Sequence, residues 1–231
     1  MNHWSNSEQK KKRTFSHPIF FTNPENKTEI ARSILKDAFN TQQHKIILSH
    51  LELNYFPLLL QHLNIENLQI NLSYNNITII PCFLYSMTNI TKLDLKFNNL
   101  SVISQRIYRL RNLISLEIRS NKLKYLPGEL LKMPKITFFN FIGNCWLNEN
   151  EIENLNKSSK NVGSPSLKTI AMKRIYKIDD DISCEREFCS VCLEVSDTKK
   201  FYKYCEFWGY KLPFMFQVCS IGCLEECKST F

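Results

Sequence analysis

Seven of the nine cysteines in this 231-residue chain lie after residue 183. They are Cys184, Cys189, Cys192, Cys205, Cys219, Cys223 and Cys227. Tetrahedral zinc takes four soft ligands, and two short chelating pairs from distant parts of a chain supply them with little strain. The cysteines of a disulfide framework would be spread through a small secreted domain instead. The sequence therefore predicts a zinc site near the carboxyl end.

The first ligand set that we predict is Cys189 and Cys192 together with Cys219 and Cys223. Cys184 competes for one of these places, because its spacing to Cys189 also allows chelation. Four thiolates fill the coordination sphere of zinc, so such a metal would hold the fold and would not activate water.

No pattern in the sequence points to catalysis. No histidine follows His62 to act as a general base beside these cysteines, and the five glycines do not assemble a phosphate-binding loop. We therefore expect a non-enzymatic protein without a small-molecule substrate.

An asparagine returns every 23 residues in the middle of the chain, at Asn75, Asn98, Asn121 and Asn144. Two apolar residues precede each one at fixed offsets, as in Leu93-x-Leu95-x-x-Asn98-x-Leu100. This spacing is typical of leucine-rich repeats. Each repeat pairs a short strand with a return segment and cannot bury its apolar side alone, so the repeats stack around one core.

A degenerate unit precedes these four repeats. It aligns through Ile46, Leu48 and Leu53, and Leu51 stands where the others have asparagine. Terminal repeats are commonly atypical. We therefore predict an α/β fold, a leucine-rich repeat solenoid over residues 46–147.

The flanking segments complete the predicted organisation. Residues 1–23 form a basic flexible arm, residues 24–45 a capping helix region, residues 148–183 a helical linker and residues 184–231 the small zinc module. Amphipathic spacing predicts a helix over residues 28–40. Its face toward the first repeat is expected to carry Ile30, Ile34, Leu35, Ala38 and Phe39.

The net charge of +8 is concentrated in the first two thirds of the chain. Residues 1–45 carry a net +4 and residues 46–147 a net +5. Clusters of lysine and arginine bind nucleic acid through its phosphates, whatever its base sequence. The alternative is that these side chains are only solvated. The residues that we predict to contact RNA are Lys10, Lys11, Lys12, Arg13, Arg106, Arg109, Arg111, Lys122 and Lys124.

Between their core positions, the repeat strands point side chains toward the concave face of the stack, where they form columns. The three columns are Ser49, Ser73, Lys96, Arg119 and Ile142; Ile47, Asn71, Asp94, Glu117 and Asn140; and Lys45, Gln69, Lys92, Ser115 and Phe138. This face is mixed polar. Its predicted contacts to a protein partner are Lys92, Lys96 and Arg119.

Further motifs follow the repeats. They are Lys200-Phe201 through Gly209-Tyr210-Lys211-Leu212-Pro213-Phe214-Met215, Val218-Cys219-Ser220-x-x-Cys223-x-x-x-Cys227, and Pro165-Ser166-Leu167 through Ile175. Together with the repeats, they cover residues 46–227 and resemble the leucine-rich repeat-containing protein fifty-eight family and its eukaryotic relatives. Cys184, Cys189, Cys219 and Cys223 match cysteines of that family.

The resemblance implies a non-enzymatic binding protein that serves as a substrate receptor of cullin-based ubiquitin ligases. Leu167, Ala171 and Ile175 resemble an elongin C binding box, with alanine where cysteine is more usual. Charge favours a different class of function, docking on a ribonucleoprotein such as the ribosome, with regulation of translation as the outcome. We rank docking first, because the charge lies on the two segments best able to present it.

No uninterrupted apolar stretch approaches the roughly 20 residues that cross a bilayer. Residues 1–13 are polar and basic and lack the apolar region of a signal peptide. We therefore expect a soluble, cytoplasmic protein without a membrane partner.

Overall fold

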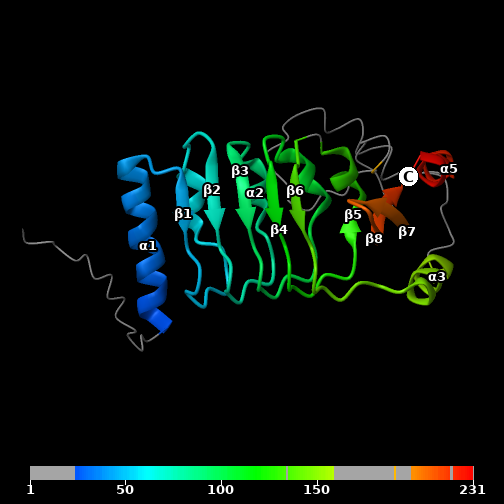
Figure 1. Ribbon diagram of the computed structural model, residues 1–231, viewed down its shortest axis with the longest axis horizontal. Helices are drawn as coiled ribbons and strands as arrows, with labels where there is room; N and C mark the ends of the chain where they lie inside the picture. The colour runs from blue at the N-terminus through cyan, green and yellow to red at the C-terminus, as the bar shows by residue number, and fades with distance from the viewer. Residues whose placement is uncertain (1–23, 134, 159–189, 191–198, 219–220, 231) are drawn as a thin grey trace, which may run out of the picture.

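The computed structural model describes residues 24–133, 135–158, 190, 199–218 and 221–230. Five short parallel strands in the order β1-β2-β3-β4-β6 form one face of an extended stack (Figure 1). They are β1 (Lys45–Ile47), β2 (Leu68–Asn71), β3 (Ile90–Asp94), β4 (Ser115–Glu117) and β6 (Phe138–Asn140). The return segments carry η1 (Leu58–His62), α2 (Cys82–Ser86), η2 (Gln105–Arg109) and η3 (Gly128–Lys132). The predicted α/β repeat architecture is confirmed.

Alternation along each strand places apolar side chains of every repeat in one continuous core. The register pairs Ile46 with Ile70, Ile70 with Leu93, Leu93 with Leu116 and Leu116 with Phe139, and all five are buried. The degenerate first unit is therefore a repeat of the same stack, although it lacks the asparagine.

Each recurring asparagine joins its own repeat to the preceding one through hydrogen bonds that are buried or, for Asn144, part-buried. Asn98 Nδ2 donates to the carbonyl oxygens of Leu95 at 3.1 Å and Leu72 at 2.9 Å, and the Ile77 N–H donates to Asn98 Oδ1 at 3.0 Å. An amide side chain suits this place because it both donates and accepts. Equivalent bonds are made by Asn75, Asn121 and Asn144.

Helix α1 (Pro24–Thr41) lies beside β1 at the amino-terminal end of the stack, as Figure 1 shows. Its Ala31, Leu35 and Ala38 are each 1% exposed and belong to the core of the repeats. The prediction that Ile30 and Phe39 share this face is wrong, because they are 36% and 54% exposed. The helix packs through its two alanines, whose small side chains allow close approach to the first repeat.

The carboxyl-terminal segment folds against the repeats as a hairpin. Strands β7 (Lys199–Phe207) and β8 (Tyr210–Val218) are antiparallel, and β8 also pairs with the short strand β5 (Leu126–Pro127) of the repeats. Phe214 and Phe216 are buried in the same core as the repeat side chains. A Cβ atom on Gly128 would lie 2.3 Å from ring atoms of Phe216, so only glycine leaves room for this ring.

Two helices complete the described structure. The side chain of Asn156 on α3 (Glu149–Ser158) accepts from the Tyr202 N–H at 2.9 Å and donates to the Tyr202 carbonyl at 2.8 Å, so α3 lies against β7. Helix α5 (Ile221–Thr230) buries Cys227 in the core. No helix in the described part of the chain is both long and apolar enough to cross a membrane.

Replacing Asn98 with alanine should lower the free energy of unfolding by about 2–5 kcal/mol. The change leaves buried backbone groups at Ile77, Leu72 and Leu95 without this partner, and each such group costs about 1–3 kcal/mol. Asn99→Ala is the matched control, since the Asn99 side chain makes no hydrogen bond to a described residue. Urea unfolding of both variants measures the difference, and equal midpoints would contradict the prediction.

Candidate functional site

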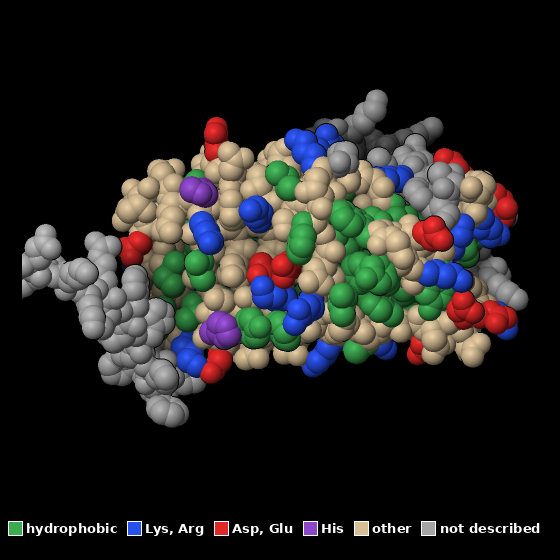
Figure 2. Space-filling model, viewed as in Figure 1, with side chains coloured by type: hydrophobic (Ala, Val, Ile, Leu, Met, Phe, Trp, Pro, Cys, Tyr) green, Lys and Arg blue, Asp and Glu red, His purple; other side chains and the backbone are tan. Residues whose placement is uncertain are grey.

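The strand register assembles the predicted columns on the concave face of the sheet. One pairs in the order Lys45, Gln69, Lys92, Ser115 and Phe138, and its neighbour in the order Ile47, Asn71, Asp94, Glu117 and Asn140. Figure 2 shows charged side chains gathered near the centre of this face and hydrophobic ones toward the carboxyl-terminal end of the sheet. The face therefore divides into a polar and an apolar region.

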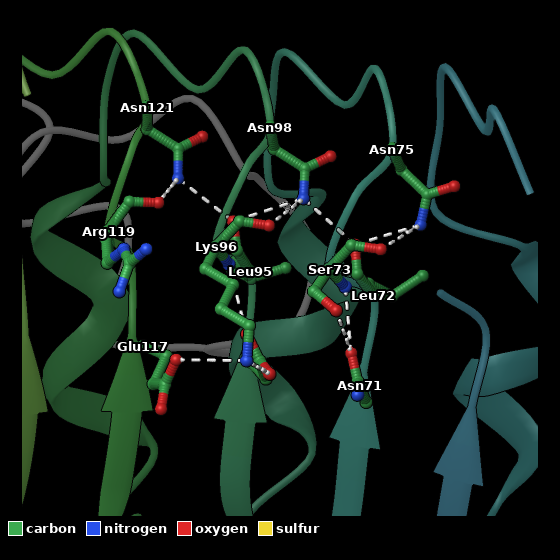
Figure 3. A network of polar contacts seen from close by, with 11 residues as sticks. Asn71, Leu72, Ser73, Asn75, Leu95, Lys96, Asn98, Glu117, Arg119 and Asn121 are labelled. Atoms are coloured by element: carbon green, nitrogen blue, oxygen red, sulfur yellow. Dashed lines mark hydrogen bonds and ion pairs between the residues drawn. The ribbon is translucent and has the colours of Figure 1, made fainter. Parts of the chain in front are cut away.

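Lys96 is held by two carboxylates of neighbouring repeats. Its Nζ lies 2.9 Å from Asp94 Oδ2 and 3.4 Å from Glu117 Oε2. Figure 3 shows this group beside the row of hydrogen-bonded asparagines Asn75, Asn98 and Asn121, which we call the asparagine ladder. The hydrogen bond to Asp94 and the charges of both carboxylates raise the pKa of Lys96, although partial burial opposes them. Lys96, one of the predicted partner contacts, is therefore already paired within the protein.

His50, Tyr74 and Phe97 form a stack of rings where the strands end. The ring centroids of His50 and Tyr74 are 4.3 Å apart and those of Tyr74 and Phe97 are 4.4 Å apart, each pair inclined by 12°. The guanidinium carbon of Arg119 lies 5.0 Å from the centroid of the Phe97 ring, a cation–π contact. The spacing of neighbouring strands, about 4.8 Å, suits stacked rings on successive repeats.

The three ring residues occupy equivalent places in their repeats, directly before Leu51, Asn75 and Asn98. Their φ angles of 61°, 56° and 53° lie in the left-handed region, which is unfavourable for residues with a Cβ atom. This stack was not predicted from the sequence, although Tyr74 and Phe97, which directly precede Asn75 and Asn98, were a signal for it.

Exposed apolar side chains lie on the last repeat and on the turn of the hairpin that packs against it. We call Phe138, Ile142, Trp208 and Tyr210 the end patch; they are between 46% and 59% exposed. Trp208 and Gly209 form the hairpin turn, with φ angles of 54° and 72°. The Tyr210 ring packs edge-on against buried Phe141 with centroids 5.1 Å apart, which places the turn against the last repeat. Trp208 and Tyr210 were not predicted as site residues.

The predicted RNA contacts within the repeats do not share one edge of the sheet. Arg106 is 9% exposed on η2, and Arg109 is half-buried there. Arg111 is exposed and precedes β4, whereas Lys122 and Lys124 are exposed and follow it. The exposed members are therefore separated by the length of a strand.

Many predicted site residues lie outside the described residues. These are Lys10, Lys11, Lys12, Arg13, Leu167, Ala171, Ile175, Cys184, Cys189, Cys192 and Cys219. Cys223 is described and lies half-buried on α5. Among the described residues, no three histidine, cysteine or acidic side chains group closely enough to hold a metal ion. Cys82, which we did not assign to the zinc site, is disulfide-bonded.

Ser190 forms hydrogen bonds with residues of β8 and η3. Its N–H donates to the Gln217 carbonyl at 2.6 Å, and the Gln217 N–H donates to Ser190 Oγ at 2.8 Å. Lys132 Nζ donates to the Ser190 carbonyl at 2.6 Å. In sequence, Ser190 lies between Cys189 and Cys192, and Gln217 stands two residues before Cys219.

Glu129 is a buried carboxylate close to Ser190. It is 1% exposed on η3, and neither carboxylate oxygen has a hydrogen-bond partner of good geometry among the described residues. Burial raises the pKa of Glu129, and the nearby Ser190 hydroxyl and Lys132 charge offset this only in part. Burial therefore makes ionisation of Glu129 less favourable in the folded protein than in the unfolded chain.

Comparison with known proteins identifies the repeats. Residues 88–144, which include β3, β4 and β6, match the family model described as leucine rich repeat. This segment consists of leucine-rich repeats. A leucine-rich repeat protein of Leptospira interrogans aligns with 48% of this chain at 29% identity and a TM-score of 0.43, and the chain spans 28% of that protein's length. None of the curated proteins matches the chain.

Glu129→Gln should raise the free energy of unfolding near neutral pH, because it removes an ionisation that burial opposes. The folded-state pKa is raised above the unfolded value of about 4.3, so wild-type stability from this group is full below that value and falls as pH rises through the folded-state pKa. Urea unfolding across this pH range should show a flatter profile for the variant. Glu66→Gln, an exposed control, should keep the wild-type slope; parallel profiles for wild type and Glu129→Gln would contradict the prediction.

Proposed function

We propose that this chain is a non-enzymatic protein-binding module, and that the concave face of its repeats is the binding surface. The observation that carries the proposal is the end patch beside Arg119. Soluble proteins seldom leave apolar patches exposed unless these bind something. Tyrosine, tryptophan and arginine also dominate the binding energy of protein interfaces. The end patch and Arg119 supply all three residue types.

The polar region of the face supports binding better than catalysis. Asp94 and Glu117 share Lys96, so both carboxylates are held in an ion-pair network that spans two repeats. Such a network orients a partner and excludes wrongly charged ones.

Within this class, we propose that the chain is the substrate receptor of an elongin/cullin ubiquitin ligase. The concave face would bind the substrate, and Leu167, Ala171 and Ile175 would bind elongin C. The end patch, which suits a protein substrate, and the resemblance of the carboxyl-terminal motifs support this role.

Docking on a ribonucleoprotein, with the ribosome as the first candidate and translation as the regulated process, is our second proposal. The net +4 of residues 1–45 and net +5 of residues 46–147 support it. We place it second because Arg106 is buried. The exposed cations are also divided, since Arg111 precedes β4 whereas Lys122 and Lys124 follow it. This order reverses the one that charge alone favoured.

We also propose a structural zinc site formed by Cys189, Cys192, Cys219 and Cys223, with Cys184 as the alternative ligand. The paired hydrogen bonds between Ser190 and Gln217 support it, since they join the two chain segments that carry these cysteines. Zinc in this place would hold the hairpin and α5 together and would leave the concave face to bind the partner.

Affinity purification separates the two proposed roles. Wild type should copurify with elongin and cullin subunits, and Leu167→Ala should abolish this by removing an apolar anchor. Reversing the charges of Lys10, Lys11, Lys12, Arg111, Lys122 and Lys124 should leave copurification intact. Sedimentation with ribosomes that weakens steeply with salt and disappears on charge reversal would support docking instead, because each phosphate contact releases counterions.

The zinc proposal predicts about one zinc ion per chain in protein purified under reducing conditions. Cys219→Ser should remove the metal and loosen the carboxyl-terminal segment, while the repeats stay folded. Cys145→Ser, at an exposed thiol outside the proposed ligand set, is the matched control and should keep the metal. Elemental analysis that finds no zinc in the wild type would reject the site.

A further inference from the structure

Arg119 and Lys96, two cations of the concave face, differ in what surrounds them. Lys96 forms ion pairs with both Asp94 and Glu117. Arg119 is exposed, and no carboxylate among the described residues lies within ion-pair distance of it. The N–H groups of the Arg119 guanidinium therefore remain available to a partner, whereas the Lys96 ammonium is already paired.

The stacked rings of His50, Tyr74 and Phe97 restrict the position of the Arg119 guanidinium. Phe97 lies under the guanidinium and is itself stacked on Tyr74, which is stacked on His50. A guanidinium that rests on a ring still has its N–H edges available, and their planar fork matches the two oxygens of a carboxylate. Because the contact already restricts the side chain, binding would cost less conformational entropy than for an unsupported arginine.

Arg119 also lies beside the end patch. Arg119 and Ile142 occupy the same place in successive repeats, and the Ser120 N–H donates to the Ile142 carbonyl at 2.8 Å across the boundary. Phe138 begins the last strand, β6, and Ile142 follows the end of that strand. A positive charge and an apolar surface therefore stand one repeat apart.

We propose that Arg119 binds an Asp or Glu side chain of an extended partner segment whose neighbouring aromatic or aliphatic residue packs on the end patch. This proposal rests on the protein-binding function proposed above and names the chemistry of its ligand. Complementarity of charge selects the carboxylate, and the adjoining apolar surface selects a polypeptide. The sheet continues on one side of Arg119 and the end patch lies on the other, so a chain can pass in both directions.

The test selects random linear peptides, displayed with amidated or blocked ends, on the immobilised full-length protein. Selected peptides should carry an acidic residue close to an aromatic or aliphatic one. Their affinity should fall at least about tenfold on Arg119→Gln, the size expected for loss of a charge-assisted bidentate pair. Phe97→Leu should weaken binding less, because it removes the support and keeps the charge. Arg111→Gln, at an exposed arginine that lies off the concave face, is the matched control and should have no effect.

Replacing the acidic residue of a selected peptide by its amide should remove the difference in affinity between wild type and Arg119→Gln. Loss of the difference would show that this acidic side chain pairs with Arg119. Peptides that bind both proteins equally, but are weakened by Phe138→Asp, would overturn the role of Arg119 and leave the proposed binding face standing. Binders found only when a peptide has a free carboxyl end would overturn the assignment to a side chain. A selection that yields no binder sensitive to Phe138→Asp or Ile142→Asp would overturn both proposals.

Discussion

The buried asparagine ladder is the interaction on which the rest of this structure depends. Where each strand ends, backbone groups would be buried without partners, and one side-chain amide satisfies groups from two repeats at once, as Asn98 does for Ile77, Leu72 and Leu95. The ladder therefore fixes each repeat against its neighbour to within one residue. Any slip in register would break these bonds and turn core side chains toward water.

That fixed register gives the concave face its chemistry. Equivalent residues of successive repeats lie one strand spacing apart, about 4.8 Å. This distance lets Lys96 reach Glu117 of the next repeat, and it lets Tyr74 and Phe97 stack with Arg119 beyond them. The ion pairs and the ring stack are thus two results of one constraint, and both use residues near the carboxyl ends of the strands.

A stack of repeats leaves an apolar surface at each end, and the two ends are covered differently. At the first repeat, α1 packs through Ala31, Leu35 and Ala38. At the last repeat, Phe139 and Phe141 replace the smaller aliphatic residues and meet Phe207 and Tyr210 of the hairpin. Because Tyr210 packs against Phe141, the hairpin turn lies at the last repeat, and its exposed Trp208 and Tyr210 belong to the end patch with Phe138 and Ile142.

The sequence by itself determined the repeats, their register and the members of each column, because a 23-residue period and strand alternation are local properties. It also contained the almost continuous apolar run from Leu212 to Val218, which is typical of a buried strand and which forms β8. Only the tertiary structure decided that β8 pairs with β5, that Arg106 is buried, and that the turn with Trp208 and Tyr210 lies at the last repeat. These depend on contacts between distant segments, such as the fit of Phe216 over Gly128, which no periodicity encodes.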